Sequence, residues 1–110
     1  EFMQAILNII NNSIDALVDK DGEKELKIII EKSKTNDLKI SIFNNGPLLP
    51  KGIEEKIFDP YFTTKKKKGG TGIGLYMTKM IIETNFQGKI KMENSSNGVK
   101  TELKIPIYEE

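Results

Sequence analysis

An asparagine-rich segment near the start of the chain carries the first side chains that could do chemistry. Its polar residues lie three or four positions apart, so on a helix they share one side, opposite a stripe of isoleucines. Asparagine and aspartate are poor helix formers, because their short side chains compete for the backbone. Short oxygen-bearing groups one turn apart suit a magnesium ion that keeps several waters and bridges phosphate oxygens. The alternative is a solvated helix face; the residues are Gln4, Asn8, Asn11, Asn12 and Asp15.

A glycine-rich stretch, Gly69-Gly70-Thr71-Gly72-Ile73-Gly74, is the second candidate. Glycine lets backbone N–H groups approach a phosphate closely, and the start of a following helix adds partial positive charge. The stretch is not a P-loop, which needs Gly-Lys-Ser/Thr, nor the dinucleotide fingerprint, because Leu75 occupies the last position of that motif. The run Lys65 to Lys68 could neutralise phosphate charge. The alternatives are a flexible turn for the glycines and a solvated loop for the lysines.

The composition excludes several other chemistries. The 110 residues contain no Cys and no His, which removes thiol and histidine catalysis, disulfides and His-liganded zinc. A net charge of +1 argues against binding to nucleic acid or to an anionic membrane. No apolar run is long enough to span a membrane, and no signal peptide opens the chain. We therefore expect a cytoplasmic globular domain, residues 1–110, which starts inside an apolar-periodic segment and is expected to be cut from a longer protein.

The hydrophobic pattern predicts the elements that must position these residues. Apolar residues at helical spacing, from Met3 to Leu17, predict a helix over 2–19 with Met3, Ile6, Ile10, Ile14 and Leu17 buried. Alternating patterns predict two hairpins, and Pro106 should end the last strand or lie at an edge. Helices with apolar stripes and strands with one apolar face indicate two layers, with helices on one face of a mixed sheet. The remaining expected elements are the strands near 26–30, 38–42, 90–92 and 99–107, a short helix at 52–58, a long loop at 61–72 and a helix at 72–84.

Together these segments resemble the ATP-binding catalytic domain of sensor histidine kinases, in the superfamily that also holds gyrase, Hsp90 and MutL. The segment from Gln4 to Ala16 resembles the asparagine box of that family. Ile57-Phe58-Asp59-Pro60-Tyr61-Phe62-Thr63-Thr64-Lys65 resembles the phenylalanine box, and Gly70-Thr71-Gly72-Ile73-Gly74-Leu75 resembles the second glycine box. The three boxes cover nearly the whole chain in the family's order. The string that begins at Phe58 favours histidine kinases over the other branches.

The resemblance implies a Bergerat-type α/β two-layer sandwich that holds ATP between its helices and under a lid of residues 61 to 71. It implies that Asn12 binds magnesium, that Asn8 lies beside the phosphates or shares the metal, and that Asp15 lies deeper in the site. Thr101 would support adenine recognition through water. The triphosphate would be held by Lys65 and by the second glycine box, residues Gly70, Thr71, Gly72, Ile73, Gly74 and Leu75.

The same resemblance implies phosphoryl transfer in a bacterial two-component system. This domain would position the γ-phosphate and the metal, while a separate dimerisation and phosphoacceptor domain of the same protein would supply the histidine. A response regulator would act downstream through that domain. The fragment itself would be a monomer with no nucleic-acid or membrane contact, although the parent protein could be membrane-anchored.

The first glycine box departs from the family pattern Asp-x-Gly-x-Gly, because the chain reads Asn44-Asn45-Gly46-Pro47-Leu48. The family's aspartate accepts a hydrogen bond from the adenine amino group. Asn44 can accept through its carbonyl oxygen, or it can flip its amide and donate. Leu48 would be strained if that position required positive φ, and its side chain would lie at the rim of the site. We predict weak ATP binding with reduced discrimination against GTP.

Two alternatives remain open at this point. One is a module of the same fold that has lost nucleotide binding and serves in docking or regulation. The other is a serine kinase of the anti-sigma type, which shares the fold and works as a compact stand-alone protein.

Overall fold

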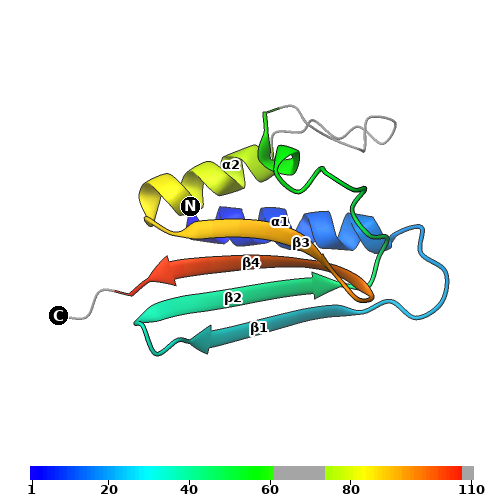
Figure 1. Ribbon diagram of the computed structural model, residues 1–110, viewed down its shortest axis with the longest axis horizontal. Helices are drawn as coiled ribbons and strands as arrows, with labels where there is room; N and C mark the ends of the chain where they lie inside the picture. The colour runs from blue at the N-terminus through cyan, green and yellow to red at the C-terminus, as the bar shows by residue number, and fades with distance from the viewer. Residues whose placement is uncertain (61–73, 108–110) are drawn as a thin grey trace.

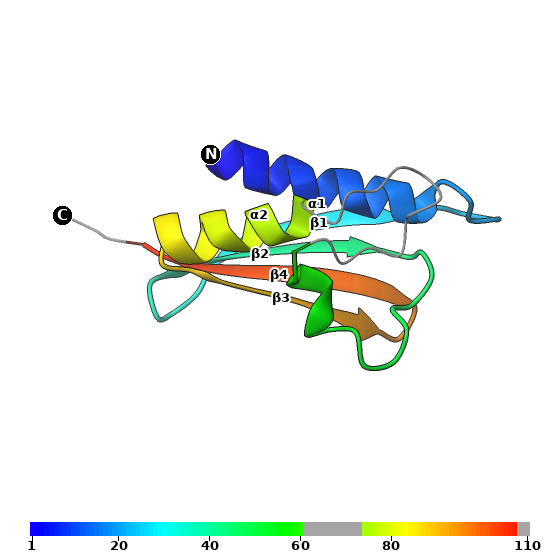
Figure 2. The same ribbon diagram turned by 90° about the horizontal axis from the view of Figure 1, so that it is seen from above.

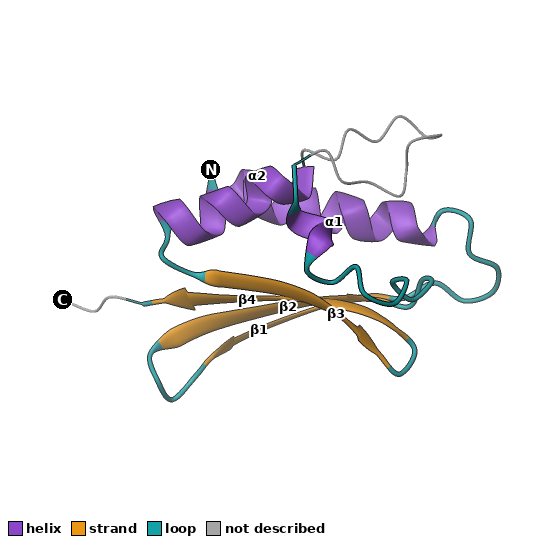
Figure 3. Ribbon diagram, turned by 45° about the horizontal axis from the view of Figure 1, so that its top comes forward, coloured by secondary structure: helices purple, strands orange, loops and turns teal. Residues whose placement is uncertain are grey.

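The protein folds into a helical layer on one face of a β-sheet, as the computed structural model shows for residues 1–60 and 74–107. All helices lie on the same side of the strands (Figure 1 and Figure 3). The two-layer α/β sandwich is therefore confirmed. The elements in chain order are α1 (Phe2–Leu17), β1 (Leu26–Lys32), β2 (Asp37–Asn44), the 3₁₀ turn η1 (Lys56–Phe58), α2 (Gly74–Met80), the π-helical turn η3 (Ile81–Asn85), β3 (Lys89–Ser95) and β4 (Gly98–Pro106).

The sheet has four strands in the order β1-β2-β4-β3. The two predicted hairpins are present, and β4 crosses to lie beside β2, where Leu38 pairs with Ile105. Every pairing among the described strands is antiparallel, so the parallel pair that a mixed sheet would contain is not among them. For β1 with β2 and for β3 with β4 the reason is that tight turns join them, and such turns can connect only antiparallel strands. β4 ends at Pro106, as predicted from the missing N–H of proline.

Helix α1 is rotated by about a quarter turn from the orientation that its isoleucine stripe predicts. Ala5, Ile9 and Ser13 are buried, whereas Met3 is 66% exposed and Ile14 is 47% exposed. The helix is apolar around more than half its circumference, so the periodicity limited the buried side to a broad arc. The rotation turns one margin of the asparagine face toward α2, and as a result Asn8 and Asn12 are half-buried.

Helix α2 and the π turn together replace the single helix predicted over 72–84. Their buried residues are Thr78, Ile81 and Ile82, with Leu75 packed at the margin of the core, as the pattern predicts. Viewed from above, α1 and α2 lie next to each other over the sheet (Figure 2). In the part of the chain that the structure describes, no helix has the length and apolar character needed to cross a membrane.

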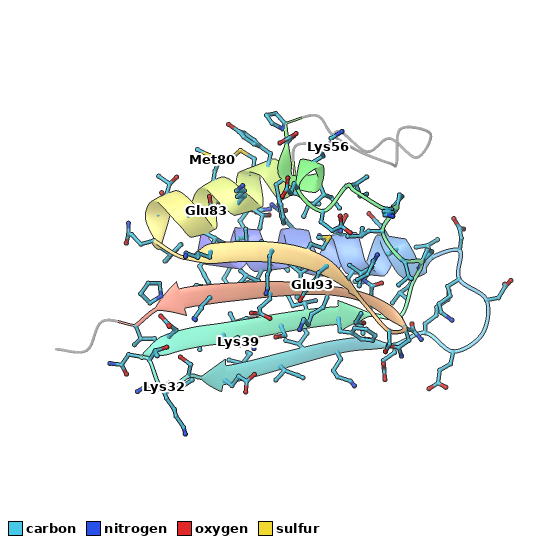
Figure 4. The ribbon with its side chains drawn as sticks, viewed as in Figure 1. Lys32, Lys39, Lys56, Met80, Glu83 and Glu93 are labelled. Carbon is cyan, nitrogen blue, oxygen red and sulfur yellow. The ribbon has the colours of Figure 1, made fainter. Side chains whose placement is uncertain are left out.

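The outer face of the sheet, which no helix covers, carries a charged network. The ammonium of Lys100 lies 3.8 Å from a carboxylate oxygen of Glu93 and 3.6 Å from one of Glu102. Lys39 lies 3.8 Å from Glu102. Figure 4 labels Lys39 on β2 and Glu93 on β3, so the network spans the sheet. These side chains are half-buried against their neighbours, and pairs at 3.6 to 3.8 Å that water still reaches contribute modestly to stability.

Candidate functional site

The asparagine face of α1 contacts the end of the glycine-rich stretch. The amide nitrogen of Asn8 donates to the carbonyl oxygen of Gly74 at 3.4 Å, although the two residues are 66 positions apart. Gln4 donates to the amide oxygen of Asn8 at 2.9 Å and orients it. The hydroxyl of Thr78 donates to the same Gly74 oxygen at 2.8 Å, which fixes the first turn of α2. The fold therefore brings together the two segments that the sequence singled out.

Asn12 and Asp15 continue the same side of α1 toward its C-terminal end. Asn12 is half-buried and Asp15 is exposed. Within residues 1–60 and 74–107, no group of three or more His, Cys, Asp or Glu side chains gathers in one place. A metal held here would therefore take few ligands from the protein. A site with few protein oxygens, such as those of Asn12 and Asp15, fits magnesium, because this ion keeps several waters and uses substrate phosphate oxygens.

The loop that follows β2 packs closely against the C-terminal half of α1. A Cβ at Gly46 would lie 2.9 Å from the carbonyl oxygen of Ala16, so only glycine allows this approach. Asn44 is buried, and its amide oxygen accepts a hydrogen bond of 3.0 Å from the N–H of Gly46. One lone pair of the Asn44 oxygen is thus engaged in holding the loop, which leaves its NH₂ group and the second lone pair of that oxygen as the remaining polar functions.

Thr101 lies beside Asn44 on the helix-facing side of the sheet. Val99 pairs with Asn44 and Thr101 pairs with Ile42, so Asn44 and Thr101 are diagonal neighbours on one face. Thr101 is only 3% exposed. The first residue of β4 also lies close to Asn44, since a Cβ at Gly98 would lie 2.0 Å from the carbonyl oxygen of Asn44. The site residues on β2 and β4 are therefore fixed by close backbone packing.

Two further asparagines, which the sequence analysis did not single out, hold the loop after β2 in place. The oxygen of Asn45 accepts from the N–H of Glu25 at 2.8 Å, and its NH₂ donates to the carbonyl of Glu23 at 3.0 Å. Asn94 makes the equivalent pair of bonds to the N–H and carbonyl of Leu49, at 2.7 and 3.0 Å. Asn45 lies in an Asn-Gly turn sequence, which is a visible signal, but Asn94 gives none.

The remaining predicted site residues divide into two groups. Leu75 is half-buried against the core and Leu48 is 51% exposed. Among the described residues other than glycine, positive φ occurs at Asn36 and Gln87, so the backbone strain expected at Leu48 is absent. The other predicted residues lie outside the described residues: Lys65, Gly70, Thr71, Gly72 and Ile73.

A two-layer sandwich in which an asparagine-bearing helix contacts Gly74, at the start of the second helix, is the arrangement with which the chain was compared. The family model of histidine kinase-, DNA gyrase B- and HSP90-like ATPases matches residues 1–109. The chain belongs to this family. Similar proteins within this family include sensor histidine kinases.

Two similar curated proteins are the sensor histidine kinase GlnK of Bacillus subtilis and the sensor protein TdiS of Thauera aromatica. GlnK is 32% identical over 106 residues, which is 93% of this chain and 26% of GlnK. TdiS is 30% identical over 109 residues, which is 97% of this chain and 20% of TdiS. The chain thus spans about a quarter or less of the length of these relatives.

Solved structures of histidine kinase catalytic domains have the same fold. The nucleotide-free catalytic domain of the histidine kinase ThkA is 41% identical, with a TM-score of 0.79 over 94% of this chain and 64% of that one. ThkA in complex with the response regulator protein TrrA superposes with a TM-score of 0.75, at 36% identity, over 94% of this chain and 27% of that one. The mycobacterial sensor histidine kinase MprB, at 17% identity and a TM-score of 0.78 over 94% of this chain and 68% of that one, shows the likeness of fold alone.

Proposed function

We propose that this domain binds Mg-ATP and presents its γ-phosphate to a histidine on a separate domain of the same protein. The observation that carries the proposal is the contact between Asn8 and Gly74, which joins the asparagine helix to the end of the glycine stretch. The chain has no histidine of its own, so the phosphoacceptor must lie elsewhere. The nucleophile and the nucleotide would then come from different domains, as phosphoryl transfer by positioning allows.

The residues predicted for the site would divide the work between metal, base and phosphates. Asn12 would hold magnesium through its amide oxygen, with Asn8 beside it; Asp15, which the resemblance implies lies deeper in the site, is exposed one turn farther along α1. Thr101 and Asn44 would face the base, while Gly46 keeps the loop close to α1. Bound magnesium would neutralise charge on the phosphate oxygens. The phosphate-holding residues would be Lys65, Gly70, Thr71, Gly72, Ile73, Gly74 and Leu75.

The direct test is titration of the 110-residue chain with Mg-ATP, followed by calorimetry and by thermal unfolding. We expect binding and a rise in Tm, because a ligand that binds only the folded state stabilises it. Phosphate transfer is then measured with a separately supplied phosphoacceptor domain from a relative such as ThkA. Because ThkA forms a complex with the response regulator TrrA, we also propose that a response regulator acts downstream of this domain.

A second candidate function is a docking module that no longer binds nucleotide. The observation that favours it is the hydrogen bond from Gly46 to the Asn44 oxygen, because that oxygen is the group a bound adenine would need as an acceptor. Absence of any Tm shift with Mg-ATP would support this second function and contradict the first.

Replacing Asn44 by aspartate is expected to raise ATP affinity by about tenfold and to lower GTP affinity. A carboxylate has two oxygens, so one can accept from Gly46 while the other accepts from the adenine amino group. The gain corresponds to one satisfied buried hydrogen bond, about 1.4 kcal/mol. Calorimetry with ATP, ADP and GTP measures it. Micromolar ATP binding with strong adenine preference in the unaltered chain would contradict the role given to Asn44.

A further inference from the structure

A cross-strand row of three residues lies at one end of the helical face of the sheet, and two of the three are asparagines. Asn44 on β2 pairs with Val99 on β4, and Val99 pairs in turn with Asn94 on β3. Paired residues share one face of a sheet, so these three side chains lie side by side across three strands. Asn44 is buried and is proposed to face the base of the nucleotide, so the row belongs to the base end of the site.

Each asparagine of this row holds one backbone position of the loop that follows β2. The amide oxygen of Asn44 accepts from the N–H of Gly46 at 3.0 Å. The amide oxygen of Asn94 accepts from the N–H of Leu49 at 2.7 Å, and its NH₂ group donates to the carbonyl of the same residue at 3.0 Å. Two bonds to one residue fix its orientation as well as its distance. The loop is therefore held at both ends of the row.

Residues 46–49 carry the chain across the end of β4, between these two points. Two strand spacings amount to about 10 Å, and three extended residues reach about the same distance. Figure 1 and Figure 2 show the loop leaving β2 and passing the ends of β4 and β3 on its way to η1. The ring of Pro47 fixes one φ angle inside the segment. Because the segment is short and stiff, a shift of Leu49 also moves Gly46 and the bond that orients Asn44.

We propose that Asn94 is a positioning residue for the base end of the nucleotide site, and that it acts through Leu49 on Asn44. This role rests on the proposed function, because it gives Asn94 a part in the binding of Mg-ATP. The side chain of Leu49 already packs against the hydrophobic core, whereas Asn94 is exposed. The two bonds from Asn94 are therefore not needed to bury the loop. They give the backbone of the loop one defined orientation beside the base.

The phosphate end of the site is built from other contacts. The hydrogen bond from Asn8 to Gly74 joins α1 to α2 and involves no residue of the loop after β2. Asn12, which is proposed to hold magnesium, lies on α1 as well. Loss of the two bonds from Asn94 should therefore weaken recognition of the base and leave the binding of the phosphates and the metal intact.

The test compares Mg-ATP with Mg-tripolyphosphate, which has no base, in the unaltered chain and in Asn94→Ala. We expect ATP to bind about five- to tenfold more weakly to the variant, because the released loop must be ordered again when the base binds. Tripolyphosphate should bind both chains within about twofold. In phosphate transfer to a separately supplied phosphoacceptor domain, KM for ATP should rise while kcat stays unchanged. The matched control is Asn97→Ala, an exposed asparagine in the turn between β3 and β4, which should change none of these quantities.

Two further measurements separate positioning from a general loosening of the fold. Amide hydrogen exchange at Leu49 should be faster in Asn94→Ala, because its N–H loses its acceptor, while Tm without nucleotide should change little. Asn94→Gln keeps both groups of the amide on a side chain one methylene longer, so it should recover part of the ATP affinity.

The outcomes distinguish this role from the proposed function itself. Equal losses for ATP and tripolyphosphate, an unfolded Asn94→Ala chain, or unchanged ATP affinity despite fast exchange at Leu49 would each overturn the role of Asn94 and leave Mg-ATP binding standing. No binding of Mg-ATP by the unaltered chain would overturn the proposed function and the role of Asn94 together.

Discussion

Replacing Asn12 by alanine is expected to weaken Mg-ATP binding by about thirtyfold. The change removes the amide oxygen proposed to hold the metal, and losing one interaction with a charged group costs about 2 kcal/mol. Fold stability without nucleotide should change little, because Asn12 is only half-buried and alanine is the better helix former. Calorimetric titration with Mg-ATP measures the effect, and Tm without nucleotide reports on the fold.

The matched control for this substitution is Asn85→Ala. Asn85 is an exposed asparagine at the end of the π turn, where its side chain contacts Glu1, away from the proposed site. It should bind Mg-ATP like the unaltered chain. Equal affinities of the Asn12 variant and this control would show that the magnesium assignment is wrong.

Replacing Gly98 by alanine is expected to destabilise the fold by about 3 kcal/mol, because the added Cβ would meet a backbone atom. That Cβ would lie 2.0 Å from the carbonyl oxygen of Asn44, and neither strand can move away without breaking the β2–β4 ladder. The expected fall in Tm is roughly 12 to 20 °C. Urea unfolding followed by circular dichroism gives the free energy of unfolding.

A second glycine provides the comparison for that experiment. A Cβ at Gly74 would meet nothing within 4 Å, so Gly74→Ala should leave the free energy of unfolding within about 1 kcal/mol of the original value. If both substitutions changed stability equally, the close approach of β4 to Asn44 would not be the cause.

Much of the fold could be predicted because local patterns and turn chemistry agree along the chain. Alternating apolar residues predicted both hairpins, and the ring of Pro106 predicted where β4 ends. The side chains of Thr78, Ile81 and Ile82 were correctly assigned to the core. The resemblance predicted that the asparagine helix and the glycine stretch surround one polyphosphate, and the hydrogen bond between Asn8 and Gly74 places the end of that stretch against the helix.

What could not be predicted depends on how the layers meet. The apolar arc of α1 is too broad to fix its rotation, so Met3 and Ile14 were wrongly assigned to the buried side. Likewise, Ile28 and Ile30 alternate as core residues do, but α1 stops short of β1 and leaves them exposed. Both outcomes follow from where a helix rests on the sheet, which is a tertiary property.

The hydrogen bonds that hold the site residues could not be predicted from the sequence either. The N–H of Gly46 donates to the amide oxygen of Asn44, a bond that the sequence does not reveal. Asn94 bonds to both the N–H and the carbonyl of Leu49, although the two residues are 45 positions apart in the sequence. No local motif marks this pair of bonds. Hydrogen bonds between distant segments need coordinates.

The charged outer face of the sheet limits how this domain can be built into anything larger. Sheets stack against each other only through dry, interdigitating side chains, and a surface bearing Lys39, Lys100 and Glu102 holds its water too strongly for that. Packing a second sheet on this face through apolar side chains would bury these charges without water, at a cost in free energy. A neighbouring domain that attached to this face would have to supply polar or charged partners and bridging water.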